Sequence, residues 1–65
     1  MNSIKISITG NFLSGKSRYF EAYLQNVPRI GEIVVIDYDE FLVEEVKWHF
    51  DDNRATWVSI KAKEV

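Results

Sequence analysis

Side chains that are apolar or β-branched occupy every second position near both ends of the chain. Residues 4–8 and 56–62 alternate in this way, and the residues that share one parity are Ile4, Ile6, Ile8, Thr56, Val58, Ile60 and Ala62. A period of two directs successive side chains to opposite faces of an extended backbone. Each segment therefore predicts a β-strand with one buried face and one face in water.

The core of such a chain must be small, because the protein has 65 residues and no cysteine. A chain of this length buries only about 60% of the surface that its unfolded form exposes. Disulfides and thiolate zinc sites cannot add to its stability. Because 46% of the residues are hydrophobic and 14% are aromatic, apolar packing can hold a fold. We expect one domain, residues 1–65, with self-association as a further source of burial.

Residues 18–27 fit two periods. Apolar residues recur there at the three- and four-residue spacing of a helix, while Phe20, Ala22 and Leu24 also alternate as in a strand. Helix-forming and strand-forming residues are mixed in the segment. We predict a strand, because the rest of the chain is β and one short helix would have little sheet to cover.

The middle of the chain contains a connection and a third strand. Pro28 and Gly31 favour an irregular segment. The β-branched run at residues 33–36 predicts a strand that is buried on both sides. Residues 37–40 are polar and predict a turn.

A longer strand follows, and the parity of its inward face changes between Val43 and Val46. This change predicts a β-bulge at Glu44 and Glu45, which would let the strand bend. Trp48 then falls on the inward face and is expected in the core. Residues 51–54 predict a hairpin turn, since Asn and Asp tolerate the left-handed conformation.

Five short strands with short connections predict an all-β, five-stranded antiparallel meander. We expect it to close as a small SH3-like barrel or roll, because an open sheet would leave its apolar face in water.

The segment from Val27 to Ile60 supports this fold. It contains VPRIGEIV, then Phe41-x-Val43-x-x-Val46-x-Trp48, then an alternating strand. The segment resembles a recurrent pattern in small uncharacterised bacterial and phage proteins of SH3-like type, and it covers about half of the chain. The resemblance implies a fold and carries no activity.

Residues 10–17 match the phosphate-binding pattern G-x-x-x-x-G-K-[ST] at every specified position. A P-loop also needs a helix that directs its N-terminal N–H groups at the phosphate, and an acidic residue on another strand for magnesium. Asp37 and Asp39 could supply the acid, but 65 residues cannot hold the parallel sheet of such an enzyme. We therefore expect a flexible loop between two strands, with Lys16 at its solvated tip.

A modest anion site is the alternative for this loop. Gly15, Lys16 and Ser17 would form it together with nearby backbone N–H groups. A hairpin over residues 10–25 excludes the P-loop, whereas a strand-loop-helix would support it. Within the loop, Phe12 and Leu13 are expected to lie against the core.

Aromatic side chains are the main candidates for binding. If Phe20 faces inward, Tyr19 and Tyr23 face outward, and Trp57 also points away from its buried neighbours. Large aromatic residues on the solvent side of a small barrel often form a binding or stacking surface. Simple packing across strands, or partial cover by the loop of residues 10–17, is the alternative.

The charge balance disfavours broad nucleic-acid binding, because eight basic and ten acidic residues give a net charge of −2. A single-stranded nucleic acid could still stack on the aromatic residues if the basic side chains cluster. The residues that would contact its phosphates are Lys16, Arg18, Lys61 and Lys63. The N-terminus lacks the continuous apolar run of a signal peptide or a membrane span, which predicts a soluble cytoplasmic protein.

No catalytic arrangement is visible in the sequence. His49 lies near Asp51 and Asp52, but one imidazole without a second soft ligand makes a poor metal site, so we expect it to face solvent. We expect no metal, no cofactor and no enzymatic activity. The sequence favours a protein-interaction module that binds a partner or its own copy through Tyr19, Tyr23 and Trp57.

Overall fold

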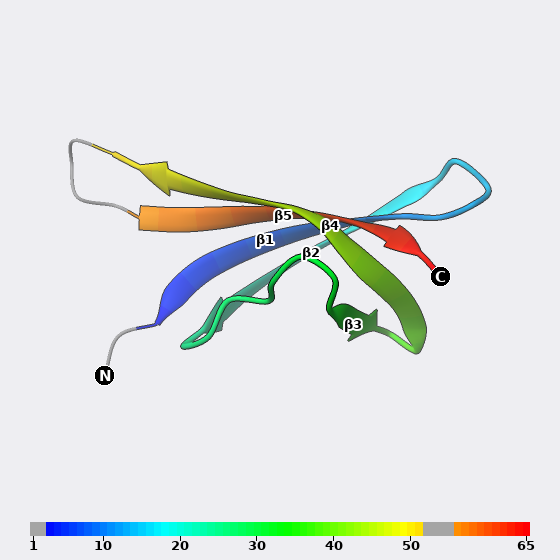
Figure 1. The fold of residues 1–65 in the computed structure, drawn as a ribbon, viewed down its shortest axis with the longest axis horizontal. Helices are drawn as coiled ribbons and strands as arrows, with labels where there is room; N and C mark the ends of the chain where they lie inside the picture. Colours follow the sequence, from blue (N-terminus) through cyan, green and yellow to red (C-terminus); the bar gives the residue numbers. More distant parts are fainter. Residues whose placement is uncertain (1–2, 52–55) are drawn as a thin grey trace.

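The computed structural model describes residues 3–51 and 56–65, and these residues form one five-stranded sheet (Figure 1). The strands are β1 (Ile4–Asn11), β2 (Ser17–Leu24), β3 (Ile33–Ile36), β4 (Asp39–Phe50) and β5 (Thr56–Glu64). The predicted all-β class is confirmed, and residues 17–24 are a strand, not a helix. In the described part of the chain no helix is long and apolar enough to cross a membrane.

The order of the strands differs from the predicted antiparallel meander. The order is β2-β1-β5-β4-β3, and β1 pairs with β5 in parallel, whereas the other neighbouring strands are antiparallel. Figure 1 shows the first and last strands side by side in the middle of the sheet. A meander would leave β1 at an edge. In the observed order, both strongly alternating strands, β1 and β5, have a neighbouring strand on each side. We infer that this order is favoured because it shields both strands.

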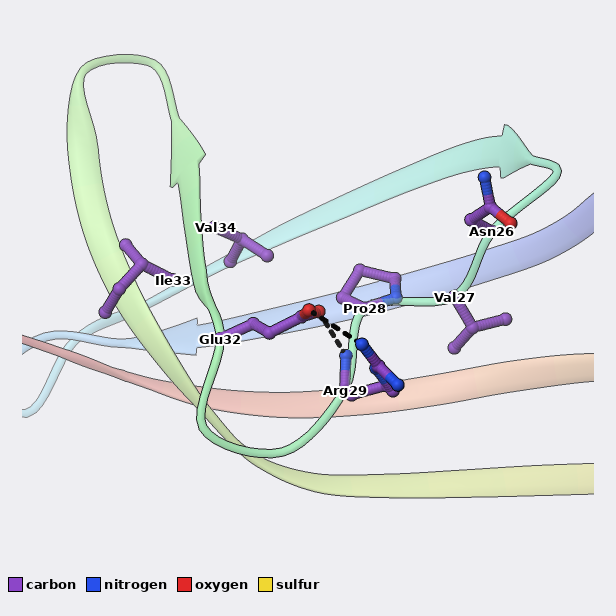
Figure 2. Close-up of a pocket in the computed structure, with 7 residues that line it drawn as sticks. All are labelled: Asn26, Val27, Pro28, Arg29, Glu32, Ile33 and Val34. Carbon is purple, nitrogen blue, oxygen red and sulfur yellow. Dashed lines mark hydrogen bonds and ion pairs between the residues drawn. The ribbon is translucent and has the colours of Figure 1, made fainter.

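The core lies on the concave face of the curled sheet. The buried apolar residues are Ile6, Ile8, Ile36, Phe41, Val43, Val58, Ile60 and Ala62. The segment of residues 25–32 connects β2 to β3 and passes across this face, where Val27 packs against the core (Figures 1 and 2). The predicted inward faces of the first and last strands are therefore confirmed.

The prediction that residues 33–36 are buried on both sides is wrong. β3 is the last strand of the sheet and pairs only with β4. Val35 is 63% exposed, while Ile36 is buried. A run of β-branched residues favours extended backbone, but burial on the second face needs a neighbouring layer that β3 does not have.

The predicted β-bulge is confirmed, because the register of β4 against β5 shifts between Val43 and Glu45. Trp48, however, is 47% exposed and is not a core residue. β3 pairs only with the part of β4 from Asp39 to Leu42. Val43 is still buried, and its backbone forms hydrogen bonds with Gly31 and Glu32. Beyond it β4 lies at the edge of the sheet, so the inward side chains of Val46 and Trp48 are only partly covered.

The turn between β3 and β4 is a two-residue hairpin. Asp37 has a φ of 50° and Tyr38 a φ of 77°, as both central residues of a type I′ turn require. The predicted turn is confirmed, although β4 already begins at Asp39. The turn predicted at residues 51–54 lies largely outside the described residues.

Phe41 packs over β1 at Gly10. A Cβ atom at Gly10 would lie 2.7 Å from the Phe41 ring, so the ring occupies the space that a side chain would need. The Phe12 ring meets Phe41 edge to face, with 5.3 Å between the ring centroids. The expected packing of Phe12 is confirmed, but Leu13 is 81% exposed and that half of the prediction is wrong.

Gly10→Ala is expected to destabilise the fold by about 1–3 kcal/mol, because the added methyl group overlaps the buried Phe41 ring. Urea unfolding followed by tryptophan fluorescence measures the change. Gly10→Ala combined with Phe41→Leu should cost less than the sum of the two single substitutions, because the smaller side chain makes room. An additive result would contradict the proposed contact.

Candidate interaction surfaces

The segment that matches the P-loop pattern forms a β-hairpin. The N–H of Gly15 donates to the carbonyl of Phe12 (2.9 Å), and the N–H of Phe12 donates to the carbonyl of Lys16 (2.7 Å). β1 and β2 run antiparallel on either side of this turn. Residues 10–24 are all described and contain no helix, so the geometry that a P-loop requires is missing there.

The two glycines of the pattern have structural roles in this hairpin. Gly10 makes room for Phe41, and Gly15 has a φ of +95°, which L-residues with a side chain rarely adopt. The side chains of Lys16 and Ser17 are exposed at the start of β2. The match to the pattern thus follows from the needs of a tight turn and a buried ring.

Arg18 connects the two ends of the curled sheet. It shares the concave face with Gly10, and its Nη1 atom lies 3.2 Å from Asp37 Oδ2 and 3.7 Å from Asp39 Oδ2. Its guanidinium also lies over the Phe12 ring, 5.6 Å from the centroid. The two acids suggested for magnesium binding therefore pair with Arg18.

The outward-facing aromatic residues predicted from the sequence lie on one face, the convex face of the sheet. Pairing between strands places Tyr23, Lys5, Trp57 and His49 in one row across β2, β1, β5 and β4. Trp57 is half-buried, because the His49 ring stacks on it at a centroid distance of 3.9 Å. Tyr23 is 70% exposed, so it offers more free ring surface than Trp57.

Tyr19 belongs to a polar cluster on the same face. Its hydroxyl donates a hydrogen bond to Glu21 Oε2 (2.6 Å), and Lys5 Nζ lies 3.6 Å from the same oxygen. This hydrogen bond raises the pKa of Tyr19 above 10.0, and together with the charge of Lys5 it lowers the pKa of Glu21 below 4.5. Tyr19 and Trp57 line one shallow hollow with Lys5, Ser7, Glu21 and Thr56.

Glu21→Gln is expected to lower the pKa of Tyr19 toward 10.0, because the Tyr19 hydroxyl would lose its hydrogen bond to the carboxylate and ionised Tyr19 would no longer face that charge. The tyrosine Cζ carbon signals in an NMR titration measure this directly. The stabilising effect of the pair is present between pH 4.5 and pH 10.0. It is lost as the pH falls through the lowered pKa of Glu21 and as it rises through the raised pKa of Tyr19. An unchanged Tyr19 titration in the variant would contradict the hydrogen bond.

The basic residues do not form one cluster. Arg18 lies on the concave face, Lys16 lies in the hairpin turn, and Lys61 and Lys63 lie on the convex face of β5. Among the described residues, those that form ion pairs with carboxylates are Lys5, Arg18, Arg29, Lys47 and Lys63. Within residues 3–51 and 56–65, the four candidate phosphate contacts are therefore not gathered into one continuous positive track.

A second aromatic surface, which sequence reasoning missed, lies on the concave side. We call it the Trp48 groove, and its lining residues are Val27, Pro28, Arg29, Ile30, Val46 and Trp48. Phe50 continues it, because the Phe50 ring stacks on Trp48 at a centroid distance of 6.3 Å. Ile30 and Phe50 are 67% and 78% exposed. The difference in length between β3, with four residues, and β4, with twelve, was the signal that could have revealed this groove. A short strand cannot cover the whole of a long one.

A further hollow lies along the connection between β2 and β3 (Figure 2). Its charged residues point toward each other: Glu32 Oε1 accepts from the N–H of Arg29 (2.7 Å), and Glu32 Oε2 lies 3.8 Å from the Arg29 guanidinium. Both charges therefore hold the turn in place. Val27 and Pro28 line this hollow and the Trp48 groove alike.

His49 is held by two neighbours and is not simply exposed to solvent. Its Nε2 atom lies 2.9 Å from Ser59 Oγ, and its ring stacks on Trp57. Among the residues that the structure describes, no group of three His, Cys, Asp or Glu side chains could hold a metal ion. Comparison with protein-family models, curated proteins and solved structures gives no match.

Proposed function

We propose that the chain is a non-enzymatic protein-interaction module that binds its partner through exposed aromatic side chains. The observation that carries this proposal is the stacked pair Trp48 and Phe50 beside an apolar groove. Buried aromatic residues contribute most of the binding energy in many protein interfaces. Stacking holds the two rings in one orientation before a partner arrives, which lowers the entropy cost of binding.

The Trp48 groove suits a partner segment with apolar side chains. Arg29 is the one charged residue of its lining, and Glu32 already pairs with it. A partner that fills the groove therefore displaces water mainly from apolar surface, and little polar surface loses its hydrogen bonds. We place the main contact here.

The convex face is less favourable for such a segment. Tyr19, Glu21 and Lys5 satisfy one another there, and their desolvation would cost free energy. His49 covers much of Trp57. Tyr23 remains as an exposed ring on that face, and the face is the alternative location for the same function.

Ile30→Ser combined with Phe50→Ser is expected to reduce partner capture at least ~10-fold, because both side chains lie exposed at the groove and would be buried by a partner. Tagged protein is incubated with lysate of the source cells, and captured proteins are quantified by mass spectrometry. The free energy of unfolding in urea should change little in this variant, because the fold leaves both Ile30 and Phe50 largely exposed.

Tyr38→Asn is the matched control, because Tyr38 is 98% exposed in the β3–β4 turn, away from both aromatic surfaces, and Asn tolerates its positive φ. Tyr23→Ser combined with Trp57→Ser tests the convex face. Loss of capture in that variant, with capture retained by the groove variant, would move the contact to the convex face. Equal capture by all variants would refute binding through aromatic residues.

We also propose that the curled sheet is a partly open, SH3-like barrel that Arg18 closes at one end. β2 and β3 are the two edge strands of the sheet. The ion pairs of Arg18 with Asp37 and Asp39 connect β2 to the turn between β3 and β4 and to the first residue of β4. The guanidinium of Arg18 lies over the Phe12 ring, which adds a cation–π attraction.

A double-mutant cycle tests this closure. One arm of the cycle is Arg18→Met, and the other is the double substitution Asp37→Asn with Asp39→Asn. The two arms are expected to show a coupling free energy of about 0.2–1 kcal/mol in urea unfolding, the range of exposed ion pairs. The coupling should shrink at high salt, because the groups are partly exposed. Additive effects at low salt would mean that the bridge does not hold the two edges together in solution.

A further inference from the structure

β2 is an unusually open edge of the sheet. It hydrogen-bonds to β1 along its full length of eight residues, without a bulge, and no strand in the described part of the chain lies on its other side. The opposite edge differs, because it is divided between the four residues of β3 and the part of β4 that follows the β-bulge and contains Lys47. Proteins commonly protect long edges with proline, lysine or a bulge. β2 has none of these, and its one cation, Arg18, is held by Asp37 and Asp39.

The hairpin geometry shows which backbone groups of β2 are free. Because the N–H of Phe12 bonds to the carbonyl of Lys16, residues 12 and 16 form a hydrogen-bonded pair. Such pairs alternate along an antiparallel ladder. Arg18, Phe20, Ala22 and Leu24 therefore direct their N–H and C=O groups at β1, and the residues that direct them outward are Ser17, Tyr19, Glu21 and Tyr23.

Apolar or aromatic side chains of β2 lie on both faces of the sheet, beside the charged residues Arg18 and Glu21. Tyr19 and Tyr23 lie on the convex face, and Phe20 and Leu24 lie on the concave face, where they are still 44% and 37% exposed. A strand in the interior of a sheet has such side chains, because neighbours on both sides cover them. The composition of β2 thus fits a strand that gains a second neighbour.

We propose that this neighbour is β2 of a second copy, paired antiparallel about a two-fold axis normal to the sheet. Such an axis keeps the two convex faces on one side and lets each strand supply both donors and acceptors. The inference names one partner of the proposed module, although it uses a different surface from the Trp48 groove. A second copy fits because antiparallel pairing of two β2 strands can place Tyr19 of each strand opposite Glu21 of the other, with no like charges opposite each other.

Charge and backbone direction select the register. Outward-directed residues must pair with outward-directed residues, which excludes shifts by one position. A two-fold axis at Glu21 would place two carboxylates opposite each other and is unfavourable. An axis at Phe20 pairs all four outward-directed residues, Ser17 with Tyr23 and Tyr19 with Glu21, and joins the two Phe20 side chains. The Tyr19 hydroxyl, which already donates to Glu21 of its own chain, then also faces Glu21 of the second copy.

Disulfide trapping tests the register in the full chain, which has no cysteine of its own. In a non-hydrogen-bonded antiparallel pair the Cα atoms are about 4.5 Å apart, within the range that a disulfide spans. Phe20→Cys is therefore expected to give a covalent dimer under mild oxidation, and Ala22→Cys is not. A dimer from Ala22→Cys in place of Phe20→Cys would overturn this register.

Sedimentation equilibrium tests the pairing itself. The wild-type protein is expected to show a concentration-dependent dimer, and Phe20→Glu should weaken it at least ~10-fold, because two carboxylates would face each other at the axis. Val35→Glu, at the exposed position of the β3 edge, is the matched control and should leave the dimer unchanged. Unfolding by urea shows whether each variant is folded.

The two proposals can fail separately. A wild-type protein that remains monomeric at high concentration would overturn the pairing through β2, whereas its capture of a partner through Ile30 and Phe50 would still support the proposed function. Conversely, a dimer that is lost in Phe20→Glu, with no partner captured by any form, would leave the pairing supported and refute the groove. If Phe20→Glu fails to fold, the outcome of the Phe20→Cys trapping decides.

Discussion

The parallel pairing of β1 with β5 is the interaction on which the rest of the structure depends. It brings the two most regularly alternating segments together, so that Ile6 meets Val58 and Ile8 meets Ile60 in one apolar layer. Between these strands the chain crosses the concave face after β2 and returns through β3 and β4. The crossing segment brings Val27 onto the core, and β4 brings Phe41 and Val43. Neither β1 nor β5 could be shielded on both sides if it lay at an edge.

This arrangement leaves two surfaces uncovered, the Trp48 groove and the edge of β2. Both proposals on function concern these surfaces. A core of this size cannot cover five strands completely, because β3 reaches only the first part of β4 and, within the described residues, β2 has a neighbouring strand on one side alone. The Trp48 groove results from the short reach of β3 along β4. The open edge of β2 results from the lack of a strand beside it in the described part of the chain. In a larger domain, helices or further strands would cover both. Here a partner and a second copy are proposed to take that place, so interaction surfaces and the limits of the fold have one cause.

The match to the P-loop pattern shows how a motif depends on its setting. All the specified residues are present, yet the glycines serve Phe41 and a tight turn. Glycine is required wherever backbone must approach another group closely or adopt a positive φ, and phosphate binding is one case of that need. The missing helix, and the pairing of Asp37 and Asp39 with Arg18, separate this hairpin from a nucleotide site.

Local periodicity sufficed to predict the five strands, the inward faces of the first and last strands, the bulge near Glu44 and the common face of Tyr19, Tyr23 and Trp57, because these depend on neighbours along the chain. Strand order, the exposure of Trp48 and Val35, and the contact of Gly10 with Phe41 required the folded structure. They depend on which distant segments become neighbours, and many orders satisfy the same alternation. The Trp48 groove belongs to this second group, since an inward-facing residue is buried only where another element covers it.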